Sequence, residues 1–149
     1  MAERRLKPAV IKVIIILSPA AVIRRRPDRN TRMRKILAAD DDPGAIGFYK
    51  DMFTDAGYEF KAAHDVTGAV MLCQDFKPDL LVLDWEMPAG GGSMIFEKVR
   101  ELTGKEIPVI FVTGMPQKVD KAGLPKVVVI QKPASVQQLL DAVARLLEE

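Results

Sequence analysis

The segment Asp79-Leu-Leu-Val-Leu-Asp-Trp-Glu-Met-Pro88 carries most of the information about the fold of this chain. Residues 80–83 are apolar throughout, which is typical of a central strand of a parallel sheet, buried on both faces. Asp84 follows this run directly. Because ligands bind at the carboxyl edge of an open parallel α/β sheet, a carboxylate in this position predicts a functional site.

Three further apolar runs end next to polar residues in the same way. They are residues 35–39 before Asp40-Asp41-Asp42, residues 107–112 before Thr113, and residues 126–130 shortly before Lys132. The carboxyl ends of parallel strands share one edge, so we expect the carboxylates, the hydroxyl and the ammonium to converge there. This combination of groups indicates a metal and phosphoryl site rather than a device for stability.

Strand and helix patterns alternate from residue 36 onward, which predicts an α/β fold with one doubly wound parallel sheet. We expect five strands, near 35–39, 58–63, 80–83, 107–112 and 127–131. Helices are expected from Pro43 to Gly57, over 66–76, from Ser93 and from Ser135. Gly114, Pro116 and Gly123 follow the fourth strand closely, so any helix in that connection must be short or absent.

Two loops carry specific backbone expectations. Asp42 is expected to cap the first helix, since Pro43 is well placed in a first turn. The loop Met87-Pro-Ala-Gly-Gly-Gly92 needs unusual backbone freedom, and Ser93 is expected to cap the helix that follows. Cys73 is the single cysteine and lies in an apolar helical pattern, which predicts a buried thiol and points to a reducing compartment.

Charge is divided unevenly along the chain. Residues 1–35 hold 11 Lys and Arg against 2 Asp and Glu, whereas residues 36–149 hold 11 against 18. The formal net charge of +2 therefore describes neither part. The length of 149 residues, with 48% hydrophobic and 28% charged residues, suits one globular domain with a full core.

The acidic residues have the chemistry of a magnesium site. Mg²⁺ takes hard oxygen ligands, usually one or two carboxylates together with waters and phosphate oxygens. Asp40, Asp41 and Asp84 offer such carboxylates without the His and Cys ligands that favour zinc. A carboxylate can also attack phosphorus and form an aspartyl phosphate. The metal, Thr113 and Lys132 could then neutralise the charge of the transferred group.

From Lys35 to Leu147 the chain resembles a response-regulator receiver domain, the phosphoacceptor module of two-component signalling. The resemblance rests on four segments that occur in register: residues 36–43, 79–88, 108–114 and 131–133. It implies a flavodoxin-like three-layer sandwich with strand order 2-1-3-4-5, in which residues 34–149 form the receiver domain.

The same resemblance implies roles for the acidic residues. Asp84 would be the phosphorylated residue. Asp41 would bind Mg²⁺ directly, and Asp40 would act largely through water. The backbone carbonyl of Glu86 would be a further metal ligand.

On the phosphoryl side, the resemblance implies that Thr113 hydrogen-bonds the phosphoryl group and that Lys132 pairs with it. The bond between Lys132 and Pro133 would be cis. Glu86 and Met115 would flank the phosphoryl position and tune its hydrolysis. Receivers usually carry Tyr or Phe three residues before the lysine. This chain has Val129 there, so the aromatic swing that usually accompanies phosphorylation cannot occur.

The expected function is that of a cytoplasmic single-domain receiver in a phosphorelay, a monomer or weak dimer with no DNA-binding domain and no transmembrane segment. A histidine kinase or a histidine phosphotransfer protein would supply the phosphoryl group, and an unidentified downstream protein would read it. The domain would promote its own phosphorylation and dephosphorylation but would not be an enzyme that turns over a metabolite. His64, the only histidine, is expected in a surface loop without a role, and Trp85 is expected to be a partly exposed aromatic beside the site.

Two alternatives stay open. A haloacid-dehalogenase-like phosphatase also uses an aspartyl phosphate, but it needs Asp two residues after the nucleophile, where this chain has Glu86. A degenerate receiver would accept no phosphate and would act through constitutive protein contacts. Val129 favours this second alternative, whereas Asp41, Asp84 and Lys132 count against it.

Residues 1–33 form a basic extension outside the receiver pattern. The apolar run 10–23 contains Lys12 and Pro19 and is too short to span a bilayer. We favour a segment that is disordered or not natively translated, with translation starting at Met33. The alternatives are a basic arm for anionic lipid or nucleic acid, and a segment that binds a partner.

Overall fold

The structure is a computed structural model, and it describes residues 32–120 and 124–148. One sheet contains five strands: β1 (Lys35–Ala39), β2 (Glu59–Ala63), β3 (Leu80–Asp84), β4 (Val109–Thr113) and β5 (Val127–Gln131). Their spatial order is β2-β1-β3-β4-β5, as expected. All neighbouring strands are parallel, so their carboxyl ends lie along one edge of the sheet.

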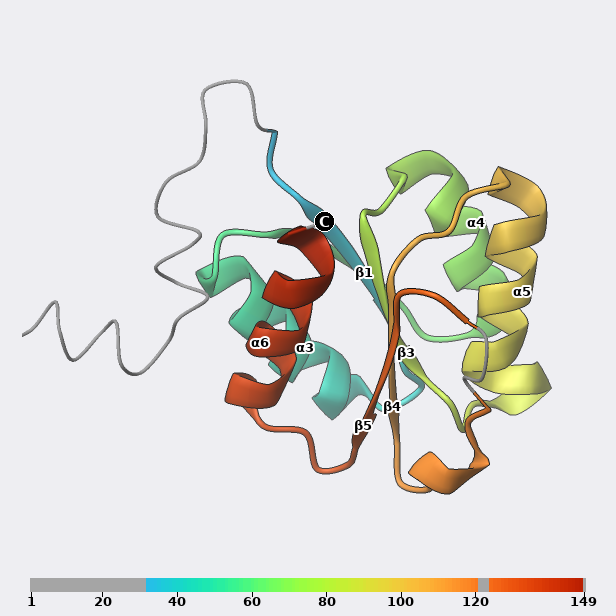
Figure 1. Cartoon of the computed structure of the whole chain (residues 1–149). Helices are drawn as coiled ribbons and strands as arrows, with labels where there is room; N and C mark the ends of the chain where they lie inside the picture. The colour runs from blue at the N-terminus through green and yellow to red at the C-terminus, as the bar shows by residue number, and fades with distance from the viewer. Residues whose placement is uncertain (1–31, 121–123, 149) are drawn as a thin grey trace, which may run out of the picture.

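Helices cover both faces of this sheet (Figure 1). α3 (Pro43–Asp55) and α6 (Val136–Glu148) lie on one face, and α4 (Val66–Phe76) and α5 (Gly91–Thr103) lie on the other. Two 3₁₀ turns, η1 (Pro88–Gly90) and η2 (Pro116–Lys118), follow β3 and β4. The arrangement is the predicted doubly wound three-layer sandwich. None of the helices in the described ranges is long and apolar enough to cross a membrane.

Each face of the sheet has its own hydrophobic core, and β3 contributes to both. Successive side chains of a strand point to opposite faces. Leu80 and Val82 pack on the side of α3 and α6, whereas Leu81 and Leu83 pack on the side of α4 and α5. Because β3 is buried along its whole length between β1 and β4, it holds Asp84 at the middle of the carboxyl edge.

Local capping explains where two helices begin. The Asp42 carboxylate accepts a hydrogen bond of 3.0 Å from the amide of Gly44, which confirms Asp42 as the cap of α3. At α6, the Ser135 hydroxyl accepts from the Gln138 amide, and the Gln138 side chain accepts from the Ser135 amide. This reciprocal pair is a capping box, and it fixes the start of α6 one residue after Ser135.

The start of α5 differs from the sequence-based expectation. Ser93 was expected to cap this helix, but α5 begins at Gly91, and the Ser93 hydroxyl donates backward to the carbonyl of Gly90. The reason is a close approach between backbones. A Cβ atom on Gly91 would lie 2.0 Å from the carbonyl oxygen of Trp85, and Gly91 also has a φ of +61°. Glycine therefore lets the helix begin two residues earlier, against the end of β3.

The limits of β4 also differ from the expected 107–112. The strand begins at Val109 and includes Thr113 as its last residue. Proline has no amide hydrogen, so Pro108 only accepts a ladder bond, from Leu81 at 2.9 Å. Thr113 is paired in register with Gln131 of β5.

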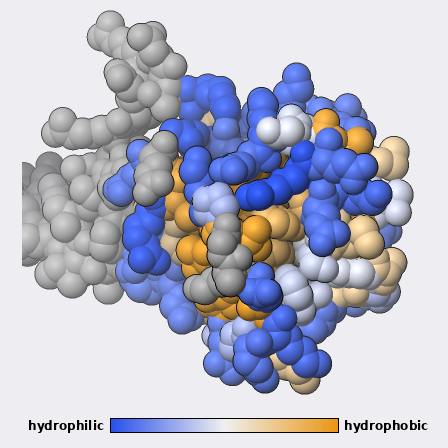
Figure 2. Space-filling view, turned by 45° about the vertical axis from the view of Figure 1, so that its right-hand side comes forward, coloured by the Kyte–Doolittle hydropathy of each residue, from blue (hydrophilic) through white to orange (hydrophobic). Residues whose placement is uncertain are grey.

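The connection from β4 to β5 contains only the short turn η2 within its described residues, as the glycines and proline of this segment predict. Apart from residues 121–123, which are not described, this connection therefore packs no α-helix over the sheet. Leu124, Val127 and Val129 are only partly buried against the core on this side. Figure 2 shows apolar residues reaching the surface on the side of the molecule where β5 is the edge strand.

Candidate metal centre at the carboxyl edge of the sheet

Asp84 lies at the middle of the site, as the last residue of β3. It is 3% exposed. Its Oδ1 atom accepts a hydrogen bond of 3.1 Å from the amide of Glu86 and another of 3.1 Å from the ammonium of Lys132. One carboxylate oxygen is thus held from two sides by donors, which fixes the orientation of the group.

Asp40 and Asp41 follow β1 and lie beside Asp84. A carboxylate oxygen from each of the three residues falls within 4.8 Å of the other two. Asp40 is 1% exposed, and its Oδ1 accepts from the amide of Asp42 at 2.9 Å. Asp41 is exposed, so the cluster is open to solvent on this side. The residues expected to hold Mg²⁺ are therefore brought together.

Lys132 is the ammonium that faces this cluster. Its Nζ lies 3.1 Å from Oδ1 of Asp84 and 3.6 Å from Oδ2 of Asp40. Burial alone would lower the pKa of Lys132, but the hydrogen bond to Asp84 and the charge of Asp40 raise it above its ordinary value. Lys132 is therefore a permanent cation at this edge. The following bond, Lys132–Pro133, is cis, as expected.

Asp84 is not fully compensated by this lysine. Burial and the negative charge of Asp40 raise the pKa of Asp84 from 3.8 to about 6, against the opposing effect of Lys132. Oδ2 of Asp40 is buried and has no hydrogen-bond partner among the described residues, because 3.6 Å to Lys132 is too long for such a bond. The cluster therefore holds more negative charge than its protein partners neutralise.

These observations fit a divalent cation. A buried carboxylate oxygen without a partner is rare in proteins, and hard carboxylate oxygens are the ligands that Mg²⁺ prefers. Asp40, Asp41 and Asp84 provide these oxygens, and the exposure of Asp41 gives a route of entry from solvent. The acidic cluster is typical of the Mg²⁺ site of a receiver. The predicted ligation by the backbone carbonyl of Glu86 stays a prediction.

The side chain of Glu86 has a position that the sequence did not indicate. Its Oε2 accepts a hydrogen bond from the hydroxyl of Thr113, and its Oε1 accepts one of 3.1 Å from the amide of Gly114. Thr113 is fully buried, and its oxygen also accepts from the amide of Met115 at 2.9 Å. The carboxylate of Glu86 thus bridges the ends of β3 and β4, and we call this contact the Glu86 bridge.

Close packing holds the loop after β3 in addition to the hydrogen bonds of Glu86. A Cβ atom on Gly92 would lie 2.9 Å from the carbonyl oxygen of Asp84 and 3.1 Å from the ring of Phe111. Trp85 is half-buried and packs edge-on against Phe111, with ring centroids 5.1 Å apart. Trp85 is therefore the partly exposed aromatic that was expected beside the site.

Other singled-out residues lie away from this chemistry. His64 is exposed in a bend between β2 and α4. Cys73 is buried in α4, and burial raises the pKa of its thiol to about 11, so it stays protonated. Met115 is 44% exposed next to Thr113, and Val129 lies within β5, partly buried against the core.

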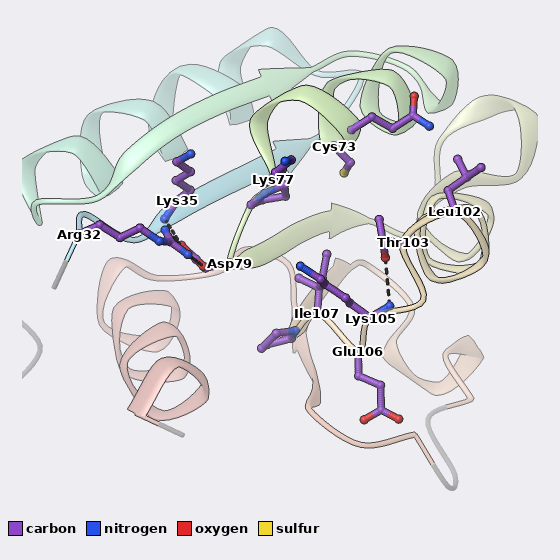
Figure 3. A pocket seen from close by; sticks show the side chains of 13 residues that line it. Arg32, Lys35, Cys73, Lys77, Asp79, Leu102, Thr103, Lys105, Glu106 and Ile107 are labelled. Carbon is purple, nitrogen blue, oxygen red and sulfur yellow. Dashed lines mark hydrogen bonds and ion pairs between the residues drawn. The ribbon is translucent and has the colours of Figure 1, made fainter. Parts of the chain in front are cut away.

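A cavity of about 700 Å³ lies between the carboxyl ends of α4 and α5 and the amino end of β3, away from the acidic cluster (Figure 3). At its rim, Arg32 forms a two-point ion pair with Asp79, with distances of 2.5 and 2.8 Å. The Lys35 ammonium donates to the carbonyl of Phe76. Arg32 and Lys35 thus have partners at a carboxylate and at the carboxyl end of a helix.

Comparison with known proteins agrees with this geometry. A family model described as "Response regulator receiver domain" matches residues 36–144. The DNA-binding dual master transcriptional regulator RpaA of Synechocystis is 32% identical over 122 residues, which cover 77% of this chain and 49% of RpaA. The chain thus spans about half the length of this relative.

Solved structures show the same fold. The chemotaxis response regulator CheY4 of Vibrio cholerae superposes with a TM-score of 0.70 at 25% identity, over 77% of this chain and 99% of CheY4. A response regulator receiver domain protein from Clostridium thermocellum gives a TM-score of 0.70 at 22% identity, over 78% of this chain and 95% of that one. Over most of its length, this chain belongs to the response regulator receiver domain family, which is not usually classed among enzymes.

Proposed function

We propose that this protein is a phosphoacceptor that takes a phosphoryl group onto Asp84 from the phosphohistidine of a histidine kinase or a histidine phosphotransfer protein. The observation that carries the proposal is the incomplete compensation of charge at the carboxyl edge. Asp84 and Asp40 are buried side by side against the ammonium of Lys132, and within the described part of the chain an oxygen of Asp40 has no hydrogen-bond partner. Such an arrangement is costly for stability unless a cation completes it, and this favours a role in chemistry.

In the transfer step, a carboxylate oxygen of Asp84 attacks phosphorus and forms a P–O bond. The P–N bond of the donor breaks, and its electron pair goes to the imidazole nitrogen, which takes a proton from solvent. Lys132 is close enough to Asp84 to pair with an oxygen of the arriving group. A magnesium ion held by Asp40, Asp41 and Asp84 would supply further positive charge to the phosphoryl oxygens.

Hydrolysis removes the phosphoryl group and returns Asp84 to its unmodified state. The oxygen of a water molecule attacks phosphorus, the P–O bond to Asp84 breaks, and inorganic phosphate leaves while the carboxylate is restored. The protein would then signal through the difference in its contacts between the two states, in the cytoplasm, as a monomer or weak dimer. Since Val129 replaces the usual aromatic residue, that difference does not depend on an aromatic swing in β5.

Incubation of the protein with Mg²⁺ and acetyl phosphate, followed by mass spectrometry of the intact chain, tests this proposal. We expect one added phosphoryl group that requires Mg²⁺, is stable in acid and is labile in base. Asp84→Asn should abolish it. Asp79→Asn changes the same charge at the other end of β3 and should leave it intact. A label that survives in Asp84→Asn, or no label in the wild-type protein, would refute the proposal.

The second candidate function is a degenerate receiver that acts through constitutive contacts. The Glu86 bridge favours it, because a carboxylate already accepts the hydrogen bond of the Thr113 hydroxyl. The labelling experiment separates the two candidates, since a degenerate receiver would carry no phosphoryl group on Asp84 under any of these conditions.

A further inference from the structure

We propose that the Glu86 bridge is a built-in competitor for phosphorylation: the Glu86 carboxylate occupies the hydroxyl hydrogen of Thr113, the donor expected for a phosphoryl group on Asp84, and phosphorylation must displace it. This inference rests on the proposed function of Asp84. It assigns to Glu86 a side-chain role that is separate from the predicted contact of its backbone carbonyl with the metal.

The argument begins with the number of hydrogens that the donors have. A threonine hydroxyl has one hydrogen to donate, and a backbone amide has one. The hydroxyl of Thr113 donates to Oε2 of Glu86, and the amide of Gly114 donates to Oε1. The single hydroxyl hydrogen of Thr113 is therefore in use on Glu86, and the hydroxyl is fully buried, with its oxygen also accepting from the amide of Met115. A phosphoryl oxygen can gain this hydroxyl only if the carboxylate leaves it.

The second step concerns charge. Glu86 is one of the three carboxylates whose charges raise the pKa of Lys132, together with Asp40 and Asp84. A phosphoryl group would bring further negative charge to the same place. Because like charges at close range repel in a partly buried site, the phosphoryl group and the bridging carboxylate would oppose each other. Displacement of Glu86 would remove this opposition.

The third step is that the bridge can open. Glu86 belongs to the loop after β3, and the residue is exposed, so its side chain can turn into solvent without unpacking the core. Its amide, by contrast, is held on Oδ1 of Asp84 at 3.1 Å. The backbone would stay in place on the phosphorylated residue while the side chain leaves. Opening is therefore a local event that couples the phosphoryl state to the position of one side chain between β3 and β4.

Hydrogen bonds to a charged carboxylate are stronger than neutral ones, and a competitor lowers apparent affinity by the fraction of time it occupies the site. Removal of the bridge should therefore raise the affinity for a phosphoryl mimic at least about tenfold. The probe is beryllofluoride in the presence of Mg²⁺, and its dissociation constant can be followed through the fluorescence of Trp85, the single tryptophan.

Three variants of Glu86 separate the effect of its charge from the effect of its hydrogen bonds. Glu86→Gln removes the charge and Glu86→Ala removes the bridge, and both should bind the probe at least about tenfold more tightly than the wild type. Glu86→Asp keeps the charge, but a side chain shorter by about 1.5 Å cannot span to Gly114, so it should also bind more tightly. A purely electrostatic effect would leave Glu86→Asp unchanged. Glu97→Gln, which removes an exposed carboxylate of α5, is the matched control and should equal the wild type.

The outcomes are distinct. Tighter binding by Glu86→Ala, Glu86→Gln and Glu86→Asp supports the competitor. If the wild type binds the probe and the Glu86→Ala and Glu86→Asp variants bind it equally or more weakly, the competitor is refuted and the proposed function stands. If neither the wild type nor any variant binds the probe with Mg²⁺, the proposed function fails and the inference fails with it.

Discussion

Two aspartates at opposite ends of β3 are held in opposite ways. Asp79 precedes the strand and receives a two-point ion pair from Arg32 and the amide of Lys35 at 2.7 Å. Burial opposes the ionisation of Asp79, but these donors lower its pKa below the ordinary value. Asp84 ends the strand beside Asp40, and its pKa is raised to about 6. The charge of Asp79 is thus compensated by its protein partners, whereas the charge of Asp84 is compensated only in part and would be completed by a cation.

The comparison separates a structural ion pair from a functional site. Both carboxylates have a basic partner, so the presence of an Asp–Lys or Asp–Arg pair says little alone. What differs is the surroundings: Arg32 is 61% exposed and faces a single carboxylate, whereas Lys132 must serve two buried ones. A raised carboxylate pKa that a specific neighbouring charge explains is an indicator of a functional site.

The largest expected effect comes from the two basic partners. Lys132→Met should lower the rate of Mg²⁺-dependent labelling by acetyl phosphate about 100-fold, because it removes a cation that stabilises charge on the transferred group. Arg32→Met removes the partner of Asp79 and should leave the rate within about twofold of the wild type. Equal losses of labelling rate in the two variants would contradict the distinction between a functional carboxylate at Asp84 and a structural one at Asp79.

Stability should change in opposite directions when each aspartate is neutralised. The pKa of Asp84 is higher in the folded than in the unfolded protein, so the folded state binds this proton more tightly. The stabilisation that protonated Asp84 contributes is therefore complete below about pH 4 and is lost as the pH rises through 6. In metal-free protein at pH 7.5, Asp84→Asn should therefore increase the free energy of unfolding by about 2 kcal/mol. This gain should vanish near pH 4. Urea denaturation at the two pH values measures it, and a loss of stability at pH 7.5 would contradict the account.

The affinity for Mg²⁺ should fall as Asp84 takes up a proton. Since metal ligation needs the ionised carboxylate, lowering the pH from 7 to 5 should weaken binding about tenfold for a group with a pKa of about 6. Calorimetric titration of the wild type and of Asp79→Asn should give the same pH dependence. An affinity that does not vary between pH 5 and 7 would place the cation elsewhere.

The smallest effect is expected at the amino end of β3. Asp79→Asn should lower the free energy of unfolding by about 1 kcal/mol at pH 7.5, since it weakens a partly exposed ion pair with Arg32 and the hydrogen bond that the Lys35 amide donates. The pKa of Asp79 is lowered in the folded state, so its contribution is present above about pH 4 and lost as pH falls. Thermal denaturation at pH 7.5 and pH 3 tests this sign.

The strands and helix caps that depend on neighbouring residues in the chain were predictable from the sequence. Features that depend on contacts between residues far apart in the chain were not. The apolar runs before Asp40 and Asp84 predicted β1 and β3, and Asp42 beside Pro43 predicted a cap. The early start of α5 was not predicted. It depends on the close approach of the Gly91 backbone to the carbonyl oxygen of Trp85, and no sequence pattern indicates such a contact.

The site divides in the same way. Convergence of Asp40, Asp41 and Asp84 follows from the shared edge of parallel strands and was therefore predictable. The direction of the Glu86 side chain depends on the spacing between the ends of β3 and β4, as does its contact with Thr113. The expected roles of residues 1–33 lie outside the described residues and stay predictions.

The central claim is that the charge of Asp84 is left uncompensated so that a cation can complete the site. Carboxyl ¹³C NMR titration of Asp84, without and with Mg²⁺, tests it most directly. The account predicts a pKa near 6 in the metal-free protein and a clear decrease when Mg²⁺ is added, while the pKa of Asp79 stays low in both states. A pKa of Asp84 near its ordinary value of 3.8 that Mg²⁺ does not change would contradict it.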